Sequence, residues 1–179
     1  MSDEMIMDRV RQGQLEETSL LYERYYPQLY NFYLRISFNR EVSKDLTQNV
    51  FMRLLKYRHT YDPGNNFRSW IFRIARNEFS DHLKKAAREG LNYHDLEEIN
   101  LELGNHIEDN EKLDEMRILQ KAMCMIDTEY RSLIVMSRYH KLKYREIAEI
   151  TGSNENAVKA KLFRAMNKLR DAFFSIQNI

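Results

Sequence analysis

The segment from Tyr144 to Arg170, YREIAEITGSNENAVKAKLFRAMNKLR, constrains the fold more than any other part of the chain. Apolar residues recur in its second half at intervals of four, three and four, which predicts the buried side of one helix. These residues are Val158, Leu162, Ala165 and Leu169. A shorter amphipathic helix precedes them and carries Ile147 and the small Ala148. The segment therefore predicts two helices packed closely against each other.

The turn between these helices has the chemistry that a sharp reversal requires. Gly152 can adopt a positive φ at little cost, and Asn154 can cap the second helix. This arrangement predicts a helix-turn-helix, whose second helix enters the major groove of DNA. The outward side of that helix carries Asn156, Lys159, Ala160 and Phe163, with Lys161 and Arg164 on its flanks. The alternative is a plain helical hairpin with a charged surface.

Composition extends the helical prediction to the whole chain. The 179 residues include only five Gly and two Pro, which is typical of an all-α protein with few tight turns. One cysteine, Cys124, excludes an internal disulfide and a cysteine-based metal site. No apolar run approaches the roughly 18 residues of a membrane helix, and the N-terminus lacks a signal peptide's apolar core. We expect a cytoplasmic protein with no membrane insertion and no cofactor.

Charge divides the chain into three parts. Residues 1–89 carry a net charge of +3, residues 90–116 carry −8, and residues 117–179 carry +6. The acidic part has no sustained helical stripe until about Leu113, and such a composition is more often flexible than packed. The pattern predicts two small helical domains, 1–89 and 113–179, joined by an acidic flexible linker over 90–112.

The N-terminal domain is expected to begin with two helices. The first runs from about Leu15 to Ile36, with a bend at Pro27. The second is capped by Asn39 and has an apolar stripe formed by Val42, Leu46, Val50 or Phe51, Leu54 and Leu55. Its opposite side carries Glu41, Asp45, Gln48 and Met52.

A loop and a third helix follow. Turn residues predict a loop over Tyr57–Asn66, which contains Tyr57, His59 and Tyr61. The third helix is expected from Phe67 to Lys85, with Phe67 and Trp70 in the core and a basic and polar face formed by Arg73, Arg76, Asn77, Ser80 and Lys84. Aromatic rings beside cations suit unpaired bases, because bases stack on rings while phosphates require positive charge. The alternative is a solvated helix face.

Three motifs together resemble one family. SKDLTQNVFMRLLK, FRSWIFRIARNEFSDHLKK and the segment from Tyr144 to Arg170 occur in this order, with the acidic part before the last. The chain resembles a bacterial alternative sigma factor of the extracytoplasmic-function type from about Leu15 to Phe174. The resemblance implies a non-catalytic subunit that binds core RNA polymerase, recognises two promoter elements in DNA and helps to separate the strands. It also implies a possible anti-sigma partner.

The resemblance assigns roles to the surfaces found above. Asp45 and Gln48, with Glu41 and Met52 beside them, match the segment that docks on core polymerase. The minus-ten element is assigned to Tyr57, His59, Tyr61, Arg73, Arg76, Asn77 and Ser80, with the Tyr57–Asn66 loop matching one that captures a flipped base. The minus-thirty-five element is assigned to Asn156, Lys159, Ala160, Lys161, Phe163 and Arg164. The linker resembles a segment that threads into the polymerase channels.

Two other classes of protein remain as alternatives. A two-domain helix-turn-helix regulator that is not a polymerase subunit would explain the C-terminal motif, but not the two N-terminal motifs together. A hydrolase using His94, His106 and nearby carboxylates would place its site in the expected linker, where nothing rigid would hold it.

Overall fold

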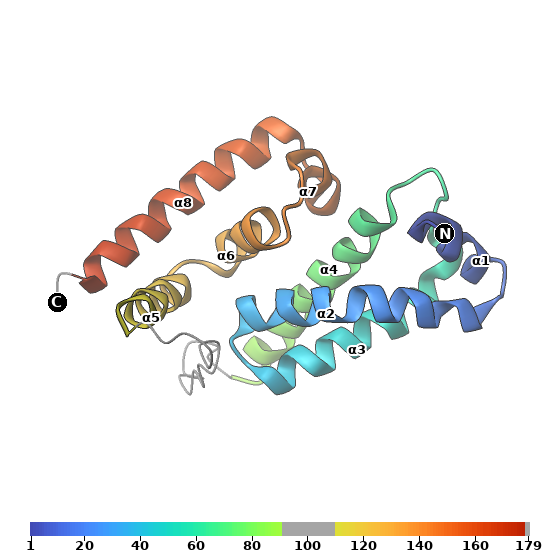
Figure 1. The fold of residues 1–179 in the computed structure, drawn as a ribbon, viewed down its shortest axis with the longest axis horizontal. Helices are drawn as coiled ribbons and strands as arrows, with labels where there is room; N and C mark the ends of the chain where they lie inside the picture. Colours follow the sequence, from blue (N-terminus) through green and yellow to red (C-terminus); the bar gives the residue numbers. More distant parts are fainter. Residues whose placement is uncertain (91–109, 178–179) are drawn as a thin grey trace.

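The computed structural model describes residues 1–90 and 110–177, and in these ranges every regular element is a helix (Figure 1). The α-helices are α1 (Asp3–Arg11), α2 (Thr18–Ser37), α3 (Arg40–Tyr57), α4 (Phe67–Arg88), α5 (Asn110–Met125), α6 (Thr128–Ile134), α7 (Tyr144–Thr151) and α8 (Glu155–Gln177). Short 3₁₀ segments η1 (Leu15–Glu17) and η2 (Arg58–Thr60) precede α2 and follow α3, and a π-helical turn, η3 (Val135–Tyr139), continues α6. The predicted all-α class is confirmed.

The N-terminal unit consists of α2, α3 and α4 packed together, with α1 against one end. The predicted stripe of α3 faces the core: Leu46, Val50, Phe51 and Leu54 are buried, and Val42 and Leu55 are partly buried. Asn39 caps α3 as expected, because its Oδ1 accepts from the Val42 amide at 3.0 Å. The Tyr33 hydroxyl donates to the Ala75 carbonyl at 2.8 Å inside the core, which fixes α4 against α2.

Helix α1 was not expected from the sequence. It is nine residues long, and it buries Ile6, Met7 and Val10 completely. Ser2 caps it through a hydrogen bond from the Met5 amide at 3.3 Å. The first predicted helix is correspondingly shorter than expected, because residues 15–17 form η1 and α2 begins at Thr18.

The C-terminal unit is formed by α5–α8, with α8 packed along α5, α6 and α7. The four predicted core residues of α8 are all buried, as are Ile147 and Ala148 of α7. Helix α5 begins at Asn110, a little before the expected boundary at 113. Residues 91–109 of the expected acidic linker lie outside the described residues, as do His94 and His106.

The two units pack against each other and share one hydrophobic core. Helix α4 lies against α7, and α2 contacts α6 and η3. His140, at the end of η3, places its ring 5.9 Å from that of Phe32 and 5.2 Å from that of Phe72, measured between centroids. This packing was not predicted, and it decides which of the candidate surfaces are accessible.

Candidate nucleic-acid interfaces

Helix α8 presents its predicted outer side to solvent. Asn156, Lys159, Ala160, Phe163 and Arg164 are exposed. Phe163 is 68% exposed, although it is a large apolar side chain. Lys161 is half-buried, and its Nζ lies 2.7 Å from Oε1 of Glu129 on α6. The surface therefore combines exposed cations with an exposed aromatic ring, which suits phosphates and the methyl group of thymine.

Local hydrogen bonds set the angle between α7 and α8. Gly152 ends α7 with φ of +66°, as the sequence predicts. Asn154 Oδ1 accepts from the Ala157 amide at 2.9 Å and so caps α8. Thr151 and Ser153 join their hydroxyls at 2.8 Å across the turn. These bonds hold the N-terminal turn of α8 outward, which is the geometry by which a recognition helix enters a major groove.

Ring contacts and a hydrogen bond hold the loop before α4 in place. Tyr57 and His59 are exposed, whereas Tyr61 is only 2% exposed. Tyr61 packs edge-on against Phe67 and Trp70, and its hydroxyl donates to the Asn65 carbonyl at 2.7 Å. In this structure its ring is buried and supports the loop, so its assignment to the minus-ten element stays a prediction.

The basic face of α4 lies partly against the C-terminal unit. Asn77 and Arg73 are both exposed, but the guanidinium of Arg73 also donates to the Glu149 carbonyl of α7 at 2.7 Å. Arg76 and Ser80 line a cavity of about 340 Å³ whose opposite wall comes from α6, η3 and Thr151. In this arrangement, three of the four predicted minus-ten side chains of α4 contact the C-terminal unit or line the cavity beside it.

Two further arginines connect the units, and neither role is predicted from the sequence. Arg68 of α4 donates to the His140 carbonyl at 2.6 Å. Arg131 of α6 is 5% exposed and donates to the Ile36 carbonyl at the end of α2 at 2.7 Å. The same guanidinium donates to the carbonyls of Met123, Cys124 and Ile126, so it closes the turn between α5 and α6 as well.

The imidazole of His140 is uncharged in this setting. Burial lowers its pKa to about 4, and the nearby guanidinium groups of Arg68 and Arg35 contribute to the shift. Its Nε2 is buried and has no hydrogen-bond partner among the described residues. A proton on this ring would therefore be unfavourable while the two units are packed together.

Helix α3 presents the third predicted surface. Glu41, Asp45, Gln48 and Met52 are all exposed, with Met52 at 68%. The orientation of α3 is fixed on its other side by Glu78 of α4, which is 7% exposed. Asn49 donates to Glu78 Oε1 at 3.0 Å, and Arg53 forms ion pairs with Glu78 and Asp81. This clamp holds the polar side of α3 outward on a rigid support.

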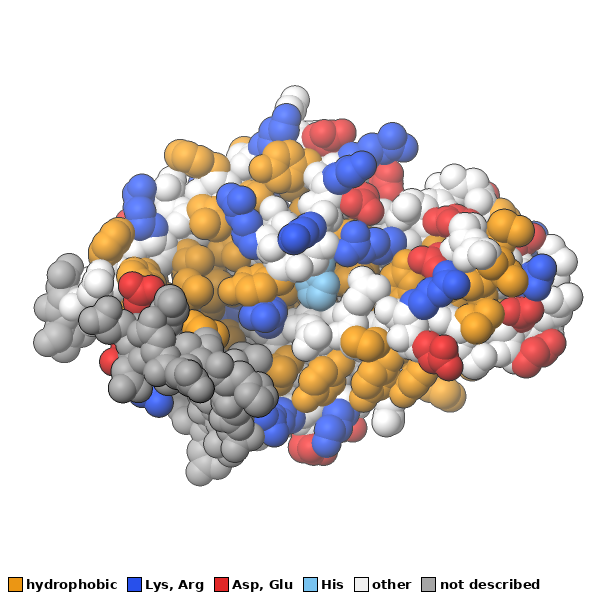
Figure 2. Space-filling model, viewed as in Figure 1, with side chains coloured by type: hydrophobic (Ala, Val, Ile, Leu, Met, Phe, Trp, Pro, Cys, Tyr) orange, Lys and Arg blue, Asp and Glu red, His pale blue; other side chains and the backbone are white. Residues whose placement is uncertain are grey.

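Figure 2 shows hydrophobic side chains reaching the surface along the middle of the molecule, with Lys and Arg side chains among them.

Within residues 1–90 and 110–177, no group of three or more His, Cys, Asp or Glu side chains could hold a metal ion. No helix in the described part of the chain is long and apolar enough to cross a membrane.

Comparison with known families gives both units a counterpart. Residues 21–89 match "Sigma-70 region 2", and residues 116–169 match "Sigma-70, region 4". Together the two matches cover more than half of the chain. The chain belongs to the sigma-70 family. It is of the extracytoplasmic-function type, so the predicted family is confirmed.

Curated relatives extend over nearly the whole sigma factor. The ECF RNA polymerase sigma factor SigM of Bacillus subtilis is 28% identical over 151 residues, covering 84% of this chain and 91% of its own length. The RNA polymerase sigma factor CarQ of Myxococcus xanthus is 25% identical over 165 residues, covering 92% and 94%.

Solved structures share the fold of this sigma factor. CnrH, solved in complex with the cytosolic domain of CnrY, is 20% identical with a TM-score of 0.72, and 97% of each chain is covered. The sigma factor RpoE of Bartonella quintana, solved with the anti-sigma factor NepR, is 22% identical with a TM-score of 0.73, covering 88% of this chain and 96% of its own.

Proposed function

We propose that this sigma factor binds core RNA polymerase through the exposed side of α3 and directs it to promoters. The exposed side of α8 recognises the minus-thirty-five element, while α4 and the loop before it bind and open the minus-ten element. The observation that carries this proposal is the presence of sigma-70 regions 2 and 4 in one chain. The exposure of Asp45 and Gln48 on α3, and of Lys159 and Arg164 on α8, supports the individual assignments.

The two DNA-binding units must separate before both promoter elements can be bound. The elements lie about 25 base pairs apart, which is roughly 85 Å along B-form DNA. Helices α4 and α7 are in direct contact, and Arg73 and Arg76 are turned towards the C-terminal unit. We infer that the packed arrangement is a resting form.

Further properties follow from this role. Sigma factors as a class are not enzymes, and we propose no catalytic activity here. We place the protein in the cytoplasm, where core polymerase and promoter DNA are found. RpoE of Bartonella quintana was solved with an anti-sigma factor, and we propose that a partner of this class holds the present chain in its resting form.

Cosedimentation with purified core polymerase separates this proposal from the main alternative, a helix-turn-helix regulator that is not a polymerase subunit. A sigma factor sediments with the core enzyme in the absence of DNA, whereas such a regulator stays in the supernatant. Permanganate footprinting of promoter thymines then tests the role of α4. Asn77→Ala should impair strand opening and leave duplex binding by α8 unchanged, and normal opening would exclude Asn77 from this role.

A further inference from the structure

Helix α1 lies outside the sigma-70 match, which begins at residue 21, yet it is firmly part of the N-terminal unit. It contacts α2, α4 and η2, and its apolar side is completely buried. It therefore touches both ends of the loop that connects η2 to α4. None of the roles proposed above for α3, α4 and α8 involves this helix.

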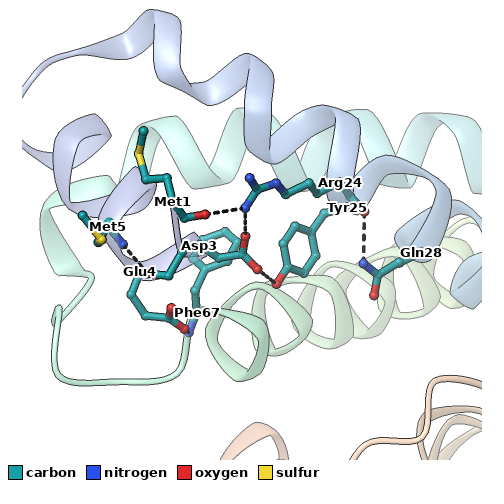
Figure 3. A network of polar contacts seen from close by, with 9 residues as sticks. Met1, Asp3, Glu4, Met5, Arg24, Tyr25, Gln28 and Phe67 are labelled. Carbon is teal, nitrogen blue, oxygen red and sulfur yellow. Dashed lines mark hydrogen bonds and ion pairs between the residues drawn. The ribbon is translucent and has the colours of Figure 1, made fainter.

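Acidic residues in the first turn of α1 connect it to both neighbouring helices (Figure 3). Asp3 accepts from the Tyr25 hydroxyl and from the Arg24 guanidinium of α2, each at 2.6 Å. Glu4 points the other way, and its Oε1 accepts from the Phe67 amide at 3.2 Å. Phe67 is the first residue of α4, so the Glu4 carboxylate lies at the positive end of that helix dipole.

Glu4 adds to the capping of α4. The first amides of a helix have no partner inside the helix, and Asn66 provides for only one of them by accepting from the Ser69 amide at 2.8 Å. The Phe67 amide depends on Glu4, a residue 63 positions away in the sequence. The start of α4 is therefore positioned by α1 as well as by its own cap.

The loop is held at its other end too. Tyr61 lies in the core close to α1, and both its burial and the nearby carboxylate of Glu4 raise the pKa of its phenol. Its hydroxyl bond to Asn65 and the Asp62–Asn65 backbone bond at 2.9 Å set the shape of the loop between these two anchors. A loop that is ordered beforehand loses less conformational entropy when it binds a ligand.

We propose that α1, acting through Glu4, is the positioning element that holds the 61–66 loop and the start of α4 in the form that accepts an unpaired promoter base. This inference rests on the proposed minus-ten role of the loop. Glu4 itself does not contact DNA in this account. Its removal raises the cost of ordering the loop and leaves the surfaces of α3 and α8 unchanged.

The test uses the full chain bound to core polymerase, with the genomic promoter fragment that gives the strongest transcript in vitro as the probe. Three variants are compared with the parent: Glu4→Ala, Glu4→Gln and Asp8→Ala. Asp8 is the matched control, because it is an acidic residue of α1 whose carboxylate accepts hydrogen bonds from the side chains of Arg11 and Gln12 at the end of the same helix. Glu4→Gln keeps an acceptor oxygen and should largely retain function.

Glu4→Ala should slow strand opening, read by permanganate, roughly three- to tenfold, the range expected for one lost hydrogen bond that orders a binding loop. It should also reduce discrimination among the four bases at the captured position. Core binding and duplex binding by α8 should not change. Hydrogen exchange of the Phe67 amide should accelerate in Glu4→Ala, which provides a second reading if opening is too slow to measure.

His59→Ala distinguishes a failure of the proposed minus-ten role from a failure of the inference about α1. If His59→Ala and Asn77→Ala both leave opening unchanged, the proposed minus-ten role is wrong, and with it this inference. If they impair opening while Glu4→Ala behaves like Asp8→Ala in both opening and exchange, the inference about α1 is wrong and the proposed function stands.

Discussion

Acidification should separate the two units of this sigma factor, because their packing disfavours the protonated form of His140. The pKa of His140 is about 4 in the packed form, against an ordinary value of 6.5. The form with separated units therefore binds this proton more tightly than the packed form does. The stability contributed by the neutral ring is fully present above about pH 7 and is lost as the pH falls from about 6.5 towards 4.

The size of the effect follows from the two pKa values. At about pH 5 the free energy that favours the packed units over the separated units falls by about 2 kcal/mol. This changes the ratio of the two forms roughly 30-fold. The guanidinium groups of Arg35 and Arg68 remain charged throughout this range, so they do not cancel the effect. Small-angle X-ray scattering provides the measurement, starting from a radius of gyration of about 16 Å for a compact chain of this length.

The parent protein should expand as the pH is lowered from about 7.5 to about 5, and His140→Phe should not, because this variant keeps an aromatic ring against Phe32 and Phe72 and removes the titrating group. His82→Gln is the control. His82 also has a pKa lowered by burial, but it lies on α4 beside Phe79 and away from His140. Equal expansion of the parent and His140→Phe would refute the reasoning.

Three further predictions address single surfaces. Asp45→Lys combined with Gln48→Ala should abolish cosedimentation with core polymerase while changing the free energy of unfolding by about 0.5 kcal/mol or less, since both side chains are exposed. Lys159→Ala should reduce the salt dependence of binding to minus-thirty-five duplex by roughly one unit, whereas Lys121→Ala on α5 should not. Arg131→Met removes the guanidinium that donates to four carbonyls, three of these bonds being buried, so we expect calorimetry to show a loss of about 3 kcal/mol and a melting temperature lower by about 6–12 °C; an unchanged melting temperature would exclude this role.

The sequence predicted best those elements whose pattern is local. The buried side of α8, the positive φ of Gly152 and the caps at Asn39 and Asn154 depend on residues within a few positions of one another. The polar side of α3 was likewise predicted from helical spacing, and its exposure in the structure agrees with that.

What the sequence did not predict depends on contacts between distant residues. Arg68 and Arg131 donate to backbone carbonyls in the other unit. Every residue has such a carbonyl, so the type of the accepting residue does not predict the bond. Helix α1 was missed because nine residues give too short a periodic pattern. Tyr61 is assigned to DNA because an aromatic residue in a polar loop suggests stacking, whereas in the structure its ring is buried against those of Phe67 and Trp70.

Run-off transcription on a genomic fragment library with core RNA polymerase tests the central claim most directly. Core enzyme alone should give only background, and addition of this chain should give discrete transcripts that share two upstream elements. The Asp45→Lys, Gln48→Ala double variant should give none. If the folded parent protein produces no transcript above the core background, and does not bind the core enzyme, the assignment of this chain as a promoter-directing sigma factor is contradicted.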